Sequence, residues 1–186
     1  MTKSDEDING IPFTQLTEFT EFDNCHFKNC LFTNADLSTI TFVDCTFNDC
    51  DFSMVKPNNT AIRDCGFKNC KLLGFRFDSC NKFLLSFKFD NCKLDYASFY
   101  QQKIKATQFI NCDLQEVDFT ECDLTRAQFI NCNLFDATFE NTLLEQADFR
   151  TATNYSLNPE TNHMYGSKFS TDGLAGLLGK YKLEIE

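Results

Sequence analysis

The feature that most constrains this chain is a four-residue segment that recurs after twenty residues: Phe109-Ile110-Asn111-Cys112 is followed by Phe129-Ile130-Asn131-Cys132. Related segments precede it: Phe89-Asp90-Asn91-Cys92, Phe67-Lys68-Asn69-Cys70, Phe47-Asn48-Asp49-Cys50 and Phe27-Lys28-Asn29-Cys30. Their Phe residues are separated by 20, 20, 22, 20 and 20 residues. A long, nearly constant period predicts a repeat architecture in which each unit packs only on its neighbours.

Within each twenty-residue unit, large apolar residues recur every five positions: Phe22, Phe27, Phe32, Leu37, Phe42, Phe47 and Phe52. A small residue precedes most of them by two positions, at Cys25, Cys30, Ala35, Cys45 and Cys50. A helix repeats at 3.6 residues and a strand at 2, so neither explains this spacing.

This pattern resembles the pentapeptide-repeat family, whose unit is a small residue, a polar residue, Leu or Phe, and two polar residues. The resemblance covers residues 18–152. It implies an all-β fold, a right-handed quadrilateral β-helix in which four pentapeptides form one square coil and the central and small residues point inward. Residues 1–17 are then expected to form an N-terminal tail and cap, and residues 153–186 a C-terminal capping and dimerisation segment.

Inward positions of stacked coils should form ladders of similar residues. With a two-residue insertion placed within Asn81 to Phe83, one ladder reads Phe27, Phe47, Phe67, Phe89, Phe109, Phe129, Phe149, and a second reads Phe22, Phe42, Ile62, Leu84, Ile104, Leu124, Leu144. The small residues Cys30, Cys50, Cys70, Cys92, Cys112 and Cys132 align in the same count. A three-residue deletion would instead move the later Cys to another face, so we favour the insertion.

Three local features modify this prediction. Pro57 occupies a central position and lacks the N–H that a ladder needs, so we expect a kink or bulge there. The insertion should bulge from the side of the rod. The row Asn29, Asp49, Asn69, Asn91, Asn111, Asn131 should turn a corner with positive φ, which Asn and Asp tolerate.

The last part of the chain loses the five-residue period. Asn158-Pro159-Glu160 indicates a turn, and Ser170 or Thr171 is a suitable N-cap for a short α-helix. We expect a homodimer interface on its apolar face and on the terminal strand, formed by Leu174, Leu177, Leu178, Tyr181, Leu183 and Ile185.

Eleven Cys in a chain that begins with polar and acidic residues favour a reducing cytoplasm, in which the thiols serve as small apolar groups. A metal or disulfide framework is disfavoured because the Cys recur at five and twenty residues, without C-x-x-C pairs or nearby His. We therefore expect no metal and no cofactor. No apolar run is long enough for a membrane span.

The sequence predicts that this protein is not an enzyme. His26 and His163 lie far apart in the chain, and inward-facing thiols have raised pKa values and low reactivity. Neither glycine-rich phosphate-binding motif is present.

Charge is distributed unevenly along the chain. The net charge is -10, made up of -8 over residues 1–54, +6 over 55–106, -8 over 107–149 and zero over 150–186. An acidic chain disfavours direct binding of nucleic acid or of an anionic membrane, and it favours basic partners.

Two functions are compatible with these features. One is a non-enzymatic binding or scaffold protein. The other follows from the resemblance to the quinolone-resistance (Qnr-type) and microcin-immunity members, and implies a DNA mimic that binds DNA gyrase or topoisomerase IV. The expected partner-binding surface in that case is Asp113, Glu116, Asp118, Glu121, Asp123, Asp136, Glu140, Glu145 and Asp148. The basic residues between Lys56 and Lys105 and the short insertion depart from the Qnr pattern.

Overall fold

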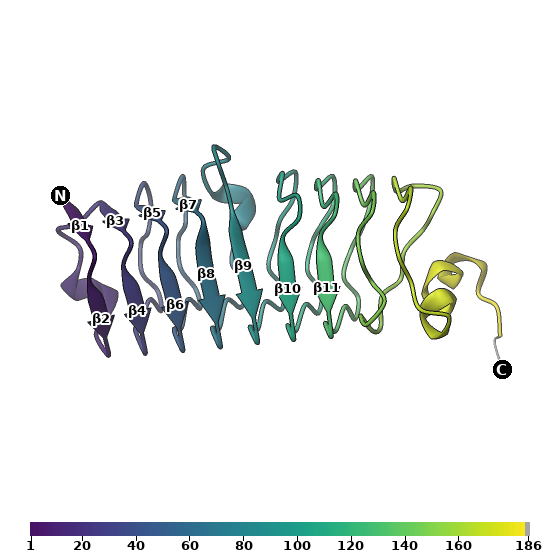
Figure 1. Cartoon of the computed structure of the whole chain (residues 1–186), viewed down its shortest axis with the longest axis horizontal. Coiled ribbons are helices and arrows are strands. Elements are labelled where there is room, and N and C mark those ends of the chain that lie inside the picture. The colour runs from purple at the N-terminus through teal and green to yellow at the C-terminus, as the bar shows by residue number, and fades with distance from the viewer. Residues whose placement is uncertain (185–186) are drawn as a thin grey trace.

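The computed structural model describes residues 1–184, which form a straight rod of stacked coils with the two termini at opposite ends (Figure 1). The strands are short: β1 Thr2–Ser4, β2 Asp7–Asn9, β3 Glu21–Asp23, β4 His26–Lys28, β5 Thr41–Val43, β6 Thr46–Asn48, β7 Ala61–Arg63, β8 Cys65–Lys68, β9 Phe87–Asp90, β10 Gln108–Ile110 and β11 Gln128–Ile130. Four 3₁₀ helices accompany them: η1 Phe13–Gln15, η2 Phe77–Ser79, η3 Asp172–Leu177 and η4 Gly179–Tyr181. The predicted all-β solenoid is confirmed.

The coil has four faces, each built from parallel neighbours. The first face begins with the sheet β1-β3-β5-β7, and the second contains the sheet β2-β4-β6-β8-β9-β10-β11. Isolated parallel bridges form the other two. On the third face they join Leu31, Asp51, Lys71, Lys93, Asp113, Asn133 and Thr153 in order, and on the fourth they join Asp36 to Lys56 and then Arg76, Ser98, Asp118 and Thr138.

Stacked aromatic rings fill the interior. Phe109 and Phe129 are fully buried, and their ring centroids lie 5.2 Å apart with the planes 2° from parallel. Each ring also meets a ring of the adjacent face edge-on, as Phe109 meets Phe119 at 5.9 Å. Burying one Phe side chain contributes about 1.5–3 kcal/mol, so stability comes from stacking successive coils.

The predicted Asn row does turn a corner with positive φ. The φ angles are 52° at Asn29, 54° at Asn69 and 52° at Asn111. The amides also bond along the row, since Asn91 Nδ2 donates to Asn69 Oδ1 at 2.9 Å and Asn131 Nδ2 donates to Asn111 Oδ1 at 3.1 Å. The row therefore stabilises both the turn and the stacking.

The small-residue positions satisfy backbone carbonyls as well as filling space. The Cys70 thiol donates to the Phe47 carbonyl at 3.3 Å, and the Cys132 thiol donates to the Phe109 carbonyl at 3.3 Å. The hydroxyls of Thr60 and Thr142 do the same at their positions. All eleven Cys are buried and free.

The solenoid extends past both ends of the predicted range 18–152. β1 and β2 pair with β3 and β4, so residues 1–17 form a coil and are not a loose tail. Its residues pair with residues 19 positions later in the chain, where the regular spacing is 20, and Lys3 takes the central position on the first face. The Lys3 ammonium lies over the Phe19 ring. At the other end Phe169 stacks on Phe149 at 5.4 Å.

Pro57 is buried and does not kink its own coil; the bulge lies one coil later. In regular coils the N–H of this position donates to the next coil, as Leu37 does to the Lys56 carbonyl. Since Pro57 has no N–H, the Arg76 carbonyl instead accepts from Ser79 within η2. The insertion follows directly and projects from the rod between β8 and β9 (Figure 1).

One ladder assignment in this loop is wrong. Leu84 is 63% exposed and has a φ of 57°, whereas its neighbour Leu85 is buried and fills the interior. The two extra residues shift the inward position by one, which periodicity alone does not specify.

The C-terminal helix is also not an α-helix but the two 3₁₀ turns η3 and η4. Gly173, Gly176 and Gly179 recur every third residue, which places them on one side of a 3₁₀ helix. A Cβ at Gly173 or Gly176 would overlap Tyr155, so the glycines permit close packing on the rod. Thr171 is the N-cap residue of η3, and the Oγ of the preceding Ser170 accepts from the Gly173 N–H at 3.2 Å.

Candidate binding surfaces

Outward side chains repeat once per coil and are held in register by the bridges beneath them. Adjacent coils are about 4.8 Å apart, so each face presents fixed rows parallel to the rod axis. His26 contributes to the second face and contacts Thr46 Oγ1 at 2.8 Å, while His163 bridges Leu143 on the first face near the other end. The structure does not bring the two His together.

The nine acidic residues predicted as a partner-binding surface do not share one face. Bridged positions place Asp113 on the third face, Asp118 on the fourth, Asp123 on the first and Asp148 on the second. Glu116 and Asp136 turn the corner after the third face, and Glu121 turns the one after the fourth. The Glu140 carbonyl accepts from the Glu121 N–H beside the corner after the fourth face, and the Glu145 carbonyl accepts from the Arg126 N–H beside the corner after the first face. The acidic residues therefore encircle the rod.

Two of these carboxylates are already paired. Asp123 lies 3.2 Å from Lys105 Nζ, and Asp148 forms an ion pair with Arg150 at 2.7 Å. Burial alone would raise the pKa of Asp123, but hydrogen bonds from Thr125 and Lys105 hold it below its ordinary value. The Arg150 guanidinium lowers the pKa of Asp148. Both groups remain negatively charged at neutral pH but contribute less to an external field.

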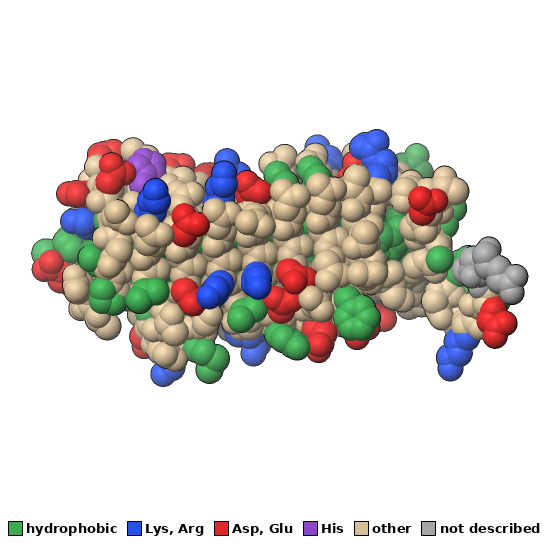
Figure 2. Space-filling view, turned by 90° about the horizontal axis from the view of Figure 1, so that it is seen from below, with side chains coloured by type: hydrophobic (Ala, Val, Ile, Leu, Met, Phe, Trp, Pro, Cys, Tyr) green, Lys and Arg blue, Asp and Glu red, His purple; other side chains and the backbone are tan. Residues whose placement is uncertain are grey.

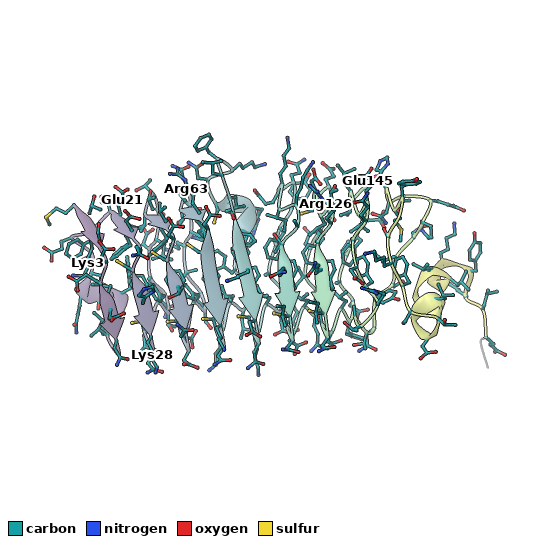
Figure 3. All side chains as sticks on the ribbon, viewed as in Figure 1. Lys3, Glu21, Lys28, Arg63, Arg126 and Glu145 are labelled. Carbon is teal, nitrogen blue, oxygen red and sulfur yellow. The ribbon has the colours of Figure 1, made fainter. Side chains whose placement is uncertain are left out.

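The basic middle of the rod carries the projecting loop. Arg63 lies on the edge from which the loop rises (Figure 3), and its guanidinium lies over the Phe83 ring at 5.5 Å. Lys82 Nζ donates to the Gln101 carbonyl, and the Phe83 N–H donates to Asn81 Oδ1 at 2.9 Å. The loop is therefore tied to both neighbouring coils although Phe83 is 65% exposed.

The predicted dimer interface is only partly available. Leu174, Leu178, Tyr181 and Leu183 are exposed, whereas Leu177 is partly buried against the core. Ile185 lies outside the described residues. Lys180 pairs with Glu160, which anchors η4 to the turn that follows Asn158.

Periodicity reasoning missed a set of exposed apolar residues on or beside the third face. Leu31, Met54, Leu73, Tyr96 and Phe135 are between 39% and 75% exposed. They could have been found as large apolar residues at outward positions of the five-residue unit. Beside them, a shallow groove of about 450 Å³ runs along the Asn corner and is lined by Lys71, Lys93 and Asp113 among others.

No group of three or more His, Cys, Asp or Glu side chains within residues 1–184 is arranged to hold a metal ion. In the same part of the chain, no helix has the length and apolar character needed to cross a membrane.

The family model described as "Pentapeptide repeat region" matches residues 20–99 and 86–171. No curated protein matches the sequence.

Three solved structures illustrate the structural likeness. QnrB1, described as a plasmid-mediated fluoroquinolone resistance protein, is 19% identical, with a TM-score of 0.48 and coverage of 100% of this chain and 99% of that one. HetL from Nostoc sp. strain PCC 7120, described as involved in heterocyst differentiation regulation, is 12% identical, with a TM-score of 0.44 over 93% and 86% of the two chains. A protein of the Arabidopsis thaliana thylakoid lumen is 18% identical, with a TM-score of 0.28 over 83% and 70%.

Proposed function

This chain belongs to the pentapeptide-repeat family, and from that premise we propose that it is a non-enzymatic scaffold that binds another protein through the outward rows of its rod. The observation that supports this most directly is the fixed register of those rows. Bridges such as Asp118 to Thr138 and Asp123 to Leu143 hold each outward residue at a constant spacing. Because the backbone beneath these rows is already ordered, a partner that docks on them need not order it, which lowers the entropic cost of binding.

The interior is suited to support rather than catalysis. The thiols point inward and donate to carbonyls, as Cys70 does to Phe47. Burial raises the pKa of the thiols of Cys80 and Cys122 well above the ordinary value, and a protonated, enclosed thiol is a poor nucleophile. Unpaired, unoxidised thiols also suit a reducing cytoplasm, where we place the protein.

The test is affinity capture from the source organism, with the wild-type rod and a charge-reversed rod as baits. Reversal of Asp113, Asp118 and Glu121 to Lys should abolish retention of the partner. A matched control reverses Asp7, Glu18 and Glu21, which are exposed near the other end, and should retain it. A partner held equally by all three baits would contradict binding through the acidic rows.

A more specific candidate is that the partner is DNA gyrase or topoisomerase IV. The supporting observation is the net charge of -8 over residues 107–149, whose acidic residues lie on all four faces of the C-terminal half of the rod. Charge complementarity would steer this end toward the basic DNA-binding groove of such an enzyme.

A gyrase supercoiling assay with and without ciprofloxacin tests this candidate directly. Titrated wild-type protein should inhibit supercoiling or protect it from the drug, and the reversal of Asp113, Asp118 and Glu121 should remove the effect. An unchanged assay at micromolar protein would rule out the topoisomerase and leave the scaffold proposal standing.

We also propose that the C-terminal segment pairs two copies of the protein. Its support is the exposure of Leu174, Leu178 and Tyr181 on turns that are themselves anchored to the rod. Truncation after Ser170 should then lower the mass measured by light scattering. An unchanged mass would exclude the tail as an interface.

A further inference from the structure

The third face carries both signs of charge and exposed apolar groups in a definite order. We name its coils by their buried central residues, Leu72, Leu94, Leu114 and Leu134. The row before these residues reads Lys71, Lys93, Asp113, Asn133, and the row after them reads Leu73, Asp95, Gln115, Phe135. Figure 2 shows this side, reached at the lower ends of β8 and β9 in Figure 1, with two adjacent cationic side chains beside an acidic group.

Several of these groups have unused capacity for interaction. Lys93 is exposed and makes no ion pair with any described residue, while Lys71 approaches Asp51 only at 4.0 Å. The hydrogen bonds to Asp113, from Gln115 and Asn133, both end on its Oδ1 atom. Leu73 and Phe135 are 39% and 50% exposed.

The order of the rows is self-complementary under one symmetry operation. A two-fold axis that lies across the face, between the Leu94 and Leu114 coils, reverses the rod and lays each row on itself. Lys93 then meets Asp113 of a second copy, and Asp95 meets the Gln115 amide. Two coils from the axis, Leu73 meets Phe135. Each contact occurs twice in such a pair.

Other registers bring like charges together. A two-fold axis through the Leu94 coil places Lys93 of one copy opposite Lys93 of the other. A two-fold axis through the Leu114 coil places Asp113 of one copy opposite Asp113 of the other. When the axis moves one coil toward the N-terminus, Lys71 of one copy lies opposite Lys93 of the other. When it moves one coil toward the C-terminus, the acidic corner residue Glu116 lies opposite the acidic corner residue Asp136. Like charges directly opposed destabilise an interface.

We infer that the third face is an interface through which a second copy of this chain packs antiparallel, with the two-fold axis between the Leu94 and Leu114 coils. The rod is straight, so contact continues along the face and is not limited to one coil. This interface is separate from the C-terminal segment and does not depend on it.

The pair should be weak and sensitive to salt. A single narrow face buries less area than a typical specific interface of roughly 1,600 Å². The net charge of -10 on each chain adds general repulsion, which salt at about 0.1 M screens beyond roughly 10 Å while contact pairs persist. We therefore expect concentration-dependent dimers at moderate salt.

Sedimentation velocity on the whole protein at about 0.1 M salt, up to roughly 0.5 mM, tests the inference with the protein itself as probe. Lys93→Glu and Asp113→Lys should each abolish association through the third face and leave only pairing through the C-terminal segment. The two variants mixed should form heterodimers, and the double variant K93E/D113K should regain the wild-type dimer, because the swap restores both pairs.

Lys88→Glu is the matched control, since it makes the same charge change on the exposed second face of the same coil. It should keep the wild-type behaviour, whereas truncation after Ser170 should remove only the pairing through the C-terminal segment and leave the concentration-dependent association that K93E abolishes. A wild-type protein that stays monomeric, a K93E variant with undiminished dimer, an equal loss in K88E, or a charge swap that fails to restore association would each overturn the inference.

Discussion

The coil that contains the insertion and the coils that contain Phe109 and Phe129 differ in what fills their small-residue positions. In the regular coils these positions hold residues such as Cys112 and Ala127. In the interrupted coil two of them hold Phe75 and Phe87, both buried, and Phe75 lies 4.3 Å from the Phe77 ring. The extra side-chain volume needs a wider coil, which the two extra residues and η2 supply. The perimeter of a coil is therefore matched to its contents.

The largest effect should distinguish an interior Phe from a loop Phe. Phe109→Asp buries a charge between two stacked rings and should unfold the protein, with a loss of more than about 4 kcal/mol. Phe83→Asp, at a 65% exposed position, should change stability by less than about 0.5 kcal/mol. Thermal unfolding followed by circular dichroism measures both. A Phe109→Asp variant as stable as the parent would refute the inward assignment.

If the length of a coil is matched to the volume of the side chains inside it, a smaller side chain and a shorter coil should compensate for each other. Phe87→Cys restores a small residue in a coil that stays wide, so it should leave a cavity and cost about 3–5 kcal/mol. Deletion of Phe83 and Leu84 in the same variant returns the coil to twenty residues and should recover much of that loss. Denaturant unfolding of the single and combined variants decides the matter, and a deletion that adds to the loss would show that perimeter and contents are independent.

Corner residues should show the next largest effect. Asn111 has a φ of 52°, and a β-branched residue there is strained. Asn111→Val should cost about 1–2 kcal/mol, in addition to the amide bond from Asn131, whereas Asn111→Gly should lose little. If the two variants unfold at the same denaturant concentration, backbone strain is not the reason for the Asn row.

In the loop of residues 81–86, a substitution can relieve backbone strain instead of introducing it. Leu84 has a φ of 57° and an exposed side chain, so Leu84→Gly removes strain without loss of packing. We expect a gain of about 0.5–1 kcal/mol. A loss of stability in the same denaturant titration would mean that the Leu84 side chain contributes to the loop.

The smallest effect concerns Asp123, which is paired with Lys105 in a regular coil. Its pKa in the folded protein is lowered, so the stabilisation is present above the unfolded pKa of about 3.9 and is lost as pH falls through the folded value. Asp123→Asn should cost about 0.5–1 kcal/mol at pH 7. The difference from wild type should vanish at about pH 2; a difference that persists there would assign the loss to packing.

The inward half of this structure follows from the sequence, and the outward half does not. The Phe27 to Phe149 ladder, the Cys row and the Asn corner repeat because each occupies the same environment in every coil. The ends escaped prediction because Lys3 replaces an apolar residue and the first offset is 19 residues. The 3₁₀ form of the tail depends on Gly173 and Gly176 meeting Tyr155, a contact between segments that no local pattern records.

The acidic surface was the least predictable feature. Nine carboxylates within 43 residues form the expected partner-binding surface, but the square coil distributes successive five-residue units over four sides. Asp113 and Asp118 are close in sequence and occupy adjacent faces. The position of a residue along the rod therefore follows from how far along the sequence it lies, while the face it occupies follows from its place within the twenty-residue coil. Residues form one binding surface only when both positions bring them together.

The missing N–H of Pro57 also bears on how this protein can be altered. Because the Arg76 carbonyl is satisfied by Ser79 within its own coil, the wall above Pro57 has one fewer bond holding the two coils together. Extra chain already leaves the wall just after this point, at residues 82–85, while the flanking Asn81 and Ser86 N–H groups donate to the Thr60 and Ile62 carbonyls of the preceding coil. This location is thus a ready attachment point for a foreign peptide, which would be displayed at a defined height on a rigid support.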